Sequence, residues 1–161
     1  WLPQKAIEYV GDFLGMALTV DNVQPSPRPN AWRIDRITIA GGFMGLAELA
    51  FWTIALGVGV YAIGFGLGAP RTLDFLLMVF GNQATCYNNR DRRHWWSSRP
   101  SAWLIVSSIA DILIASALAF VGIGMTPLPA SVIAATLGAA AVFMAALDWV
   151  KAPLFSYLRL A

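Results

Sequence analysis

The chain has 161 residues, of which 58% are hydrophobic and only 12% are charged, and its mean hydropathy is +0.62. A water-soluble domain of this size carries about 25% charged residues, so the composition excludes an ordinary soluble protein and indicates an integral membrane protein. The net charge of +2 is small, and the single cysteine, Cys86, excludes an intramolecular disulfide.

Five apolar segments predict an all-α integral membrane protein, a bundle of about five transmembrane helices in a single transmembrane domain spanning 1–161. The segments cover about 4–20, 37–63, 73–87, 102–123 and 130–150, with glycines and prolines between them. The second is long enough to cross a hydrocarbon core ~30 Å thick with some tilt.

The third segment is apolar in its first half and polar in its second, where Asn82, Gln83 and Thr85 occur. Polar side chains at membrane depth are tolerated where they face other helices or water. We therefore expect this half to face other helices or water. Small-residue spacings at Gly41-xxx-Gly45 and Ala134-xxx-Gly138 predict close helix packing on the second and fifth segments.

Basic residues collect on one side of this topology. Lys5 and Arg71 lie on one side, whereas the other nine of the 11 Lys and Arg fall in the loops 21–36 and 88–101 or in the C-terminal tail. By the positive-inside rule, both loops and the C-terminus are predicted to be cytoplasmic. We expect a multi-pass protein of the plasma or inner membrane, with its first crossing starting outside.

Asp12 is the first candidate for chemistry. It lies within the first apolar segment, nine positions before Asp21, which on a helix is roughly 13 Å at ~1.5 Å per residue. If Asp21 marks the water boundary, Asp12 lies near the middle of the membrane, where a carboxylate is costly and usually functional. Such a group can bind a proton from one side and release it to the other. The alternative is a buried Asp held by hydrogen bonds for helix packing.

Glu48 and Asp111 are also predicted at membrane depth, and are possible secondary polar residues. Hydrogen bonds to partners such as Gln83, Thr85 or Ser108 would make them structural, which is the interpretation we favour. Asp148 precedes Lys151 by three residues near the end of its segment and reads as an interfacial ion pair. The sequence contains no metal-ligand pattern, phosphate-binding loop or nucleophile motif, so no catalytic, cofactor or metal residue is predicted.

One stretch resembles a known family. DFLGMALTVDNVQPSPRPNAW is similar to the sixth transmembrane helix and following cytoplasmic loop of P-type cation-transporting ATPases, in particular the plasma-membrane proton pumps. The shared positions are Asp12, Asp21, Val23, Pro25, Ser26, Pro27, Pro29 and Trp32. Arg99-Pro100 and Leu147-Asp148-Trp149-Val150-Lys151 resemble later landmarks of that family, so the likeness extends over helices six to ten.

The resemblance implies that Asp12 is the proton carrier and that the later segments support the transport core. It also implies that the chain is a fragment of a longer polypeptide that uses ATP and Mg²⁺. The family motifs D-K-T-G and T-G-E-S are absent, so the chain alone should be inactive. Expected partners are the lipid bilayer, the remaining helices and cytoplasmic domains of the same polypeptide, and the transported H⁺, with no nucleic acid. Gly11 stands where the eukaryotic proton pumps usually have Asn, so a P-type pump for Mg²⁺ or another cation is the first alternative to a proton pump. A free-standing five-helix structural or assembly protein of the membrane is the second alternative.

Overall fold

The computed structural model describes residues 15–16, 19, 34–62, 64, 68–90, 97 and 99–157. They form α2 (Ile34–Gly57), the π-helix η1 (Val58–Ala62) that continues it, α3 (Ala69–Asn89), α4 (Ala102–Val121) and α5 (Ala130–Tyr157). No strand occurs in these residues. Three helical stretches are long and apolar enough to cross a membrane: Thr38–Tyr61, Ala102–Val121 and Ala130–Phe155. The predicted all-α membrane fold is confirmed.

Most of the first predicted helix, about 4–20, and most of the loop 21–36 lie outside the described residues. α3 begins before its predicted start at about 73, because Pro70 lies in the first turn of the helix, where a missing N–H costs nothing. α5 continues past its predicted end at about 150 and contains Pro153. Both prolines stand inside helices, whereas Pro100, Pro127 and Pro129 lie between helices.

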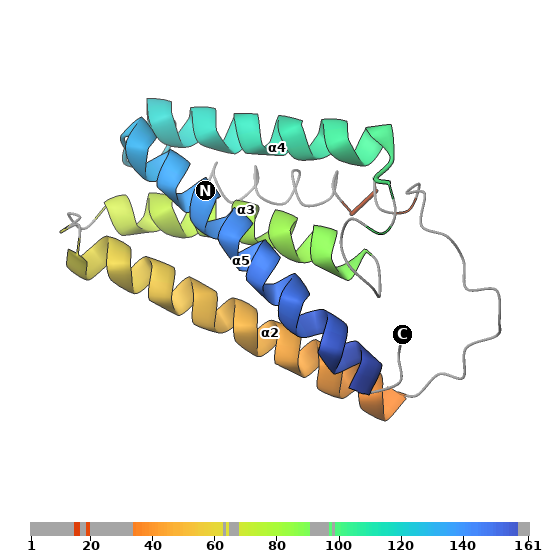
Figure 1. Ribbon diagram of the computed structural model, residues 1–161. Helices are drawn as coiled ribbons and strands as arrows, with labels where there is room; N and C mark the ends of the chain where they lie inside the picture. Colours follow the sequence, from red (N-terminus) through yellow and green to blue (C-terminus); the bar gives the residue numbers. More distant parts are fainter. Residues whose placement is uncertain are drawn as a thin grey trace.

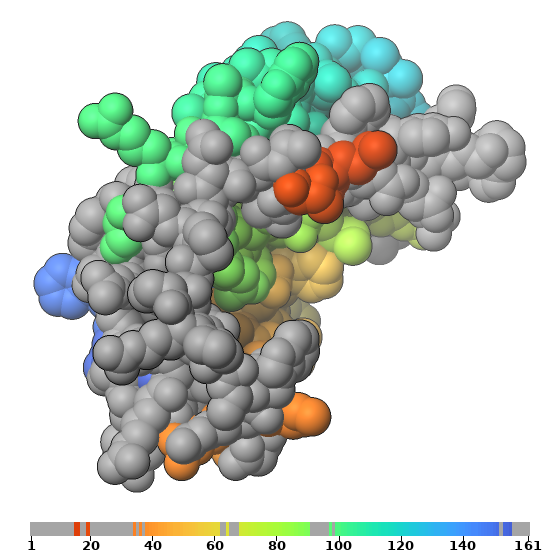
Figure 2. All heavy atoms as spheres, turned by 90° about the vertical axis from the view of Figure 1, so that its right-hand side faces the viewer, coloured from red at the N-terminus to blue at the C-terminus, as the bar shows by residue number. Residues whose placement is uncertain are grey.

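Successive helices run in opposite directions (Figure 1), so the start of α2, the end of α3, the start of α4 and the end of α5 share one end of the bundle. Figure 2 looks at this end, with the start of α4 above and the start of α2 below. Four of the five described basic residues belong to these helix ends, and the fifth stands at the opposite end: Arg36, Arg90, Arg99 and Lys151, against Arg71. The charge asymmetry of the sequence is therefore also an asymmetry of the folded bundle.

α3 occupies the centre of the bundle, with α4 on one side and α2 and α5 on the other (Figure 1). It is the one described helix that is not apolar enough to be a candidate membrane span, yet it contributes most of the buried core, including Leu76, Leu77 and Phe80. A polar helix is acceptable in the membrane when protein rather than lipid surrounds it. Its central position therefore explains how a helix of this polar composition is accommodated in the membrane.

The neighbours of α3 present matching faces. On α4 the buried residues recur every three or four positions and form one stripe: Leu104, Ser108, Asp111, Ala115 and Ala119. The two alanines are small and allow the backbones to approach closely. α2 and α5 meet directly through Phe51 and Phe143, whose rings stack with centroids 4.4 Å apart.

Polar contacts fasten α3 at both ends. At its beginning, the Thr72 hydroxyl donates to the Thr126 carbonyl oxygen in the α4–α5 connection, 2.8 Å away. At its end, the Asn88 side-chain amide donates to the Met144 carbonyl oxygen at 2.9 Å. Lys151 Nζ donates to the Asn88 carbonyl oxygen at 2.6 Å and pairs with Asp148 Oδ1 at 3.3 Å. We call these three residues, Asn88, Asp148 and Lys151, the α3–α5 clamp.

The predicted small-residue contacts are not used in the described part of the bundle. A Cβ added to Gly41, Gly45 or Gly138 would have no atom within 4 Å. All three glycines are exposed, so their faces of α2 and α5 point outward, and the prediction that they bring these helices close was wrong for this packing. Close packing occurs instead at Gly81, where an added Cβ would lie 3.3 Å from Trp52 Nε1.

Gly122 ends α4 and sets the turn into α5. Its φ of 77° is left-handed, and its N–H donates to the Leu118 carbonyl oxygen at 2.9 Å. An added Cβ would lie 2.9 Å from Pro127 Cδ and 3.1 Å from the Met125 carbonyl oxygen. Only glycine fits this helix end without strain.

Gly122→Ala should therefore destabilise the bundle by about 1–2 kcal/mol through the left-handed backbone alone, and by more through the contacts with Pro127. Thermal unfolding in detergent measures the effect. Gly138→Ala is the matched control: it is helical with open space around it, so alanine should be neutral or stabilising by up to ~1 kcal/mol. Equal melting temperatures for the two variants would contradict the prediction.

Lys151→Met should destabilise the bundle by about 3–5 kcal/mol, because it removes the ammonium group that lies 3.3 Å from the fully buried Asp148 carboxylate. The double variant Asp148→Leu/Lys151→Met removes both charges and should recover most of the lost stability, since buried ion pairs can be replaced by apolar residues at little cost. Thermal unfolding of the single and double variants tests this. A double variant no more stable than the single one would show that the pair does more than neutralise itself.

Candidate ion-binding residues

The first candidate, Asp12, lies outside the described residues, as does Asp21. The two remaining candidates from the sequence, Glu48 and Asp111, are described. Glu48 stands fourteen residues from either end of the continuous helix formed by α2 and η1, and Asp111 stands nine residues after Ala102 and ten before Val121. At ~1.5 Å per residue both carboxylates are roughly 14–21 Å from the helix ends, which is mid-depth in a ~30 Å core.

Asp111 points from α4 into the interface with α3. Gln83 Nε2 donates to Asp111 Oδ2 at 2.9 Å, and both side chains are buried. The predicted pairing of Asp111 with a polar side chain of the third segment is confirmed. One turn further along, the Tyr87 hydroxyl donates to Ser108 Oγ at 3.1 Å. The two bonds form one polar seam between the helices.

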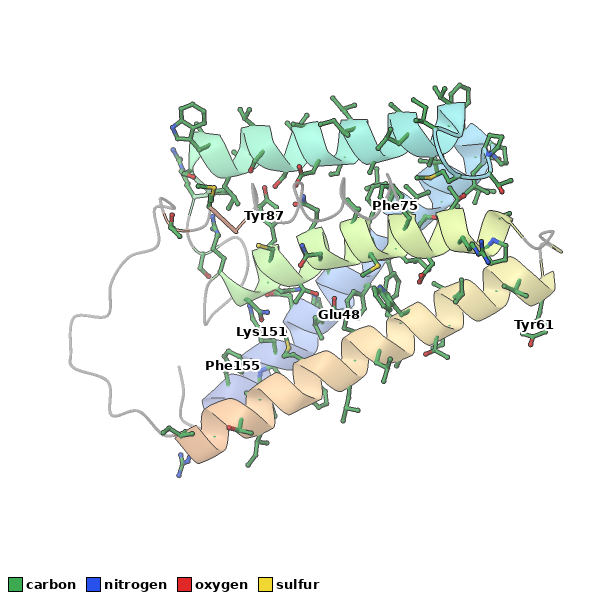
Figure 3. All side chains as sticks on the ribbon, turned by 180° about the vertical axis from the view of Figure 1, so that it is seen from behind. Glu48, Tyr61, Phe75, Tyr87, Lys151 and Phe155 are labelled. Carbon is green, nitrogen blue, oxygen red and sulfur yellow. The ribbon has the colours of Figure 1, made fainter. Side chains whose placement is uncertain are left out.

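Glu48 is arranged differently. It lies on the side of α2 that faces α3 and α5 (Figure 3), and its Oε1 is 3.9 Å from the place where a Cβ would stand on Gly81. Among the described residues its carboxylate takes part in no hydrogen bond or ion pair, so the expected polar partner is not found there. The nearby Trp52 Nε1 donates instead to the Leu77 carbonyl oxygen of α3 at 3.2 Å.

The α3–α5 clamp was only partly visible in the sequence. The Asp148–Lys151 ion pair is confirmed, but both side chains are fully buried, and Figure 3 places Lys151 between α5 and α3 rather than on an outer surface. The role of Asn88 was missed. Asn88 falls one residue beyond the predicted third segment, in the predicted loop 88–101, whereas α3 continues to Asn89; the polar residues just before it were the signal that could have found it.

Several buried polar atoms in the described part of the chain have no hydrogen-bond partner: Gln83 Oε1, Thr85 Oγ1 and Asn88 Oδ1. All three belong to the polar half of α3. In the same part of the chain, no three His, Cys, Asp or Glu side chains lie close enough to hold a metal ion. The polar half of α3 is therefore rich in neutral acceptors and poor in charged ligands.

Asn82 faces outward from α3, in contrast to its neighbours. Exposed positions on this helix recur every four or seven residues and form one stripe: Arg71, Met78, Asn82 and Asn89. An amide side chain at membrane depth is tolerated where it faces protein or water and is costly where it faces lipid. The predicted contact of the polar half with another helix is thus confirmed for Gln83, whereas Asn82 faces away from the described helices.

Exposed large apolar side chains cover the outside of α2, α4 and α5, with Ile54, Leu113 and Val142 each more than 60% exposed. Apolar surface of this extent indicates contact with lipid or with further membrane helices. Trp103 and Trp149, also largely exposed, stand at the end of the bundle that carries the basic residues, where interfacial tryptophans are favoured.

Comparison with known families agrees with this arrangement of membrane helices. Residues 12–152, most of the chain, match the family model for the C-terminus of cation-transporting ATPases. The match starts at Asp12 and extends to the residue after Lys151, so it includes the whole described bundle up to the clamp. The chain therefore belongs to the family formed by the C-terminal region of cation-transporting ATPases, and it is the membrane part of a P-type cation pump.

Proposed function

We propose that this chain is the membrane part of an ATP-driven proton-exporting P-type pump of the cell membrane, with Asp12 as the proton carrier. The observation that carries the proposal is the position of Asp12: nine residues before Asp21, inside an apolar segment, at the start of the family match. A carboxyl group in the middle of a membrane is costly when ionised. It can bind a proton in one environment and release it in another, because burial and nearby charges change its affinity for the proton.

In the proposed mechanism the Asp12 carboxylate takes up a proton from the cytoplasmic side. The phosphorylation domains, acting with ATP and Mg²⁺ in the full-length protein, then change the access of Asp12, and the proton leaves on the outer side. The basic end of the bundle is cytoplasmic in this proposal, in accord with the four basic residues collected there. This chain by itself has no part in ATP hydrolysis.

The described helices serve as a fixed frame in this mechanism. α3 is held at both ends by Thr72 and by the α3–α5 clamp, so it cannot slide easily against α5. Its outward stripe with Asn82 offers polar surface at membrane depth. Such a surface is more stable against another helix or water than against lipid.

Asp12→Asn in the full-length pump should abolish ATP-driven acidification of vesicles while leaving membrane insertion and expression unchanged, since asparagine keeps the shape but cannot carry a proton. Glu48→Gln is the matched control, a second mid-depth carboxylate to which the proposal gives no role in transport, and it should keep transport. Acidification by Asp12→Asn would overturn the assignment. Loss of transport in a well-assembled Glu48→Gln protein would move the carrier to α2.

The transported ion is tested in the same vesicles. A proton pump should acidify the vesicles at a rate that does not depend on the concentration of a candidate divalent cargo. The ATP side keeps enough Mg²⁺ for catalysis throughout. If Asp12 instead carries Mg²⁺ or another cation, ATP should drive uptake of that cation with no acidification when proton leak is controlled. The second result would keep Asp12 as a ligand and exclude the proton as cargo.

A further inference from the structure

We infer that Asp111 and Gln83 form a second proton-binding site in the membrane domain, separate from Asp12. In this site Asp111 is a neutral carboxylic acid at neutral pH, held by a reciprocal pair of hydrogen bonds with the Gln83 amide. The inference depends on the α3–α4 interface and not on the proposed role of Asp12.

The first support is the place of the carboxyl group. Asp111 is 4% exposed and Gln83 is 6% exposed, and they meet at mid-depth from two different helices. An ionised carboxylate in such surroundings costs far more than a neutral acid unless a cation compensates it. Protonation removes that cost without any further partner.

The second support is the absence of a compensating cation in the described bundle. Asp111 takes part in no ion pair there. On α3 the charged residues stand near the helix ends: Arg71, Asp74 and Arg90. Arg90, the nearest along the helix, is seven residues from Gln83, roughly 10 Å away. On α5, Asp148 and Lys151 are paired with each other.

The third support is the unused acceptor beside the carboxyl group. Gln83 donates its amide to Asp111 Oδ2 at 2.9 Å, while its own Oε1 is buried with no partner in the described chain. A neutral Asp111 carries one donor hydroxyl, which an ionised one lacks. A proton on Oδ1 could be donated to Gln83 Oε1, so that each group gives one hydrogen bond and accepts one.

The surroundings are also neutral. The next contact along the seam joins the hydroxyl groups of Tyr87 and Ser108 at 3.1 Å, and Ala115 follows Asp111 on the buried stripe of α4. Tyr87 is the other titratable group that α3 contributes to this seam. With no charged group in these contacts, burial in the interface favours the neutral acid over its anion.

Infrared spectroscopy of the full-length protein in lipid vesicles at neutral pH tests the site. The carbonyl stretch of a protonated carboxyl is separate from the absorption of a carboxylate. Asp111→Asn should remove one protonated-carboxyl band, and Gln83→Leu should move that band to higher frequency because the carbonyl loses its hydrogen bond. Asp12→Asn should leave the band in place, which separates this site from the proposed carrier even if the proposed function fails.

Isotope labelling provides a measurement that does not depend on the Asp111 or Gln83 variants being folded. Labelling the aspartate carboxyl carbons with ¹³C should move the same band to lower frequency, and the shifted band should persist in labelled Asp12→Asn protein. The proposal is overturned if no protonated aspartate band is found in that protein, or if Asp111→Asn removes a carboxylate absorption and leaves every protonated-carboxyl band unchanged.

Discussion

Two polar side chains of α3, Gln83 and Asn88, lie inside the membrane bundle with hydrogen-bond partners that α4 and α5 supply. Gln83 meets Asp111 on α4, and Asn88 meets both Met144 and Lys151 on α5. Each unsatisfied polar group in hydrocarbon costs several kcal/mol. The arrangement of the other helices around α3 follows from this requirement, since a helix of its composition would not be stable facing lipid.

Apolar burial alone does not hold such a bundle together, because lipid chains are as apolar as leucine and give helices little reason to associate. Association depends on close packing and on polar contacts between helices. Both occur along α3: alanines on α4 and Gly81 on α3 allow close approach, and Trp52 uses that space to reach the Leu77 carbonyl oxygen. The outward faces of α2, α4 and α5 keep their large apolar side chains for lipid or for further helices.

The carboxyl groups inside this bundle lie in three different environments. At the basic end Asp148 and Lys151 neutralise each other and also bind α3. At mid-depth no described cation accompanies Asp111, and an amide stands opposite it. The first arrangement lies near the edge of the membrane, where two fully buried charges neutralise each other. The second suits its middle, where a shared proton is the least costly way to neutralise a carboxylate. Glu48, near Gly81 but without a described polar partner, represents a third arrangement that the packing of α2 on α3 leaves open to neighbouring helices.

The sequence by itself determined the class of protein, the approximate extent of four described helices, the mid-depth position of Glu48 and Asp111, and the family through the residues around Asp12. Composition, apolar run length and motif spacing are local along the chain, so they can be read without a structure. The sequence also named Gln83 among the possible partners of Asp111. Only the tertiary structure decided that α3 is central, that the Asp148–Lys151 pair is buried and bound to Asn88, and that Gly41, Gly45 and Gly138 face outward. These outcomes depend on contacts between residues 25 to 63 positions apart, which helix periodicity restricts to a face but cannot assign to a neighbour.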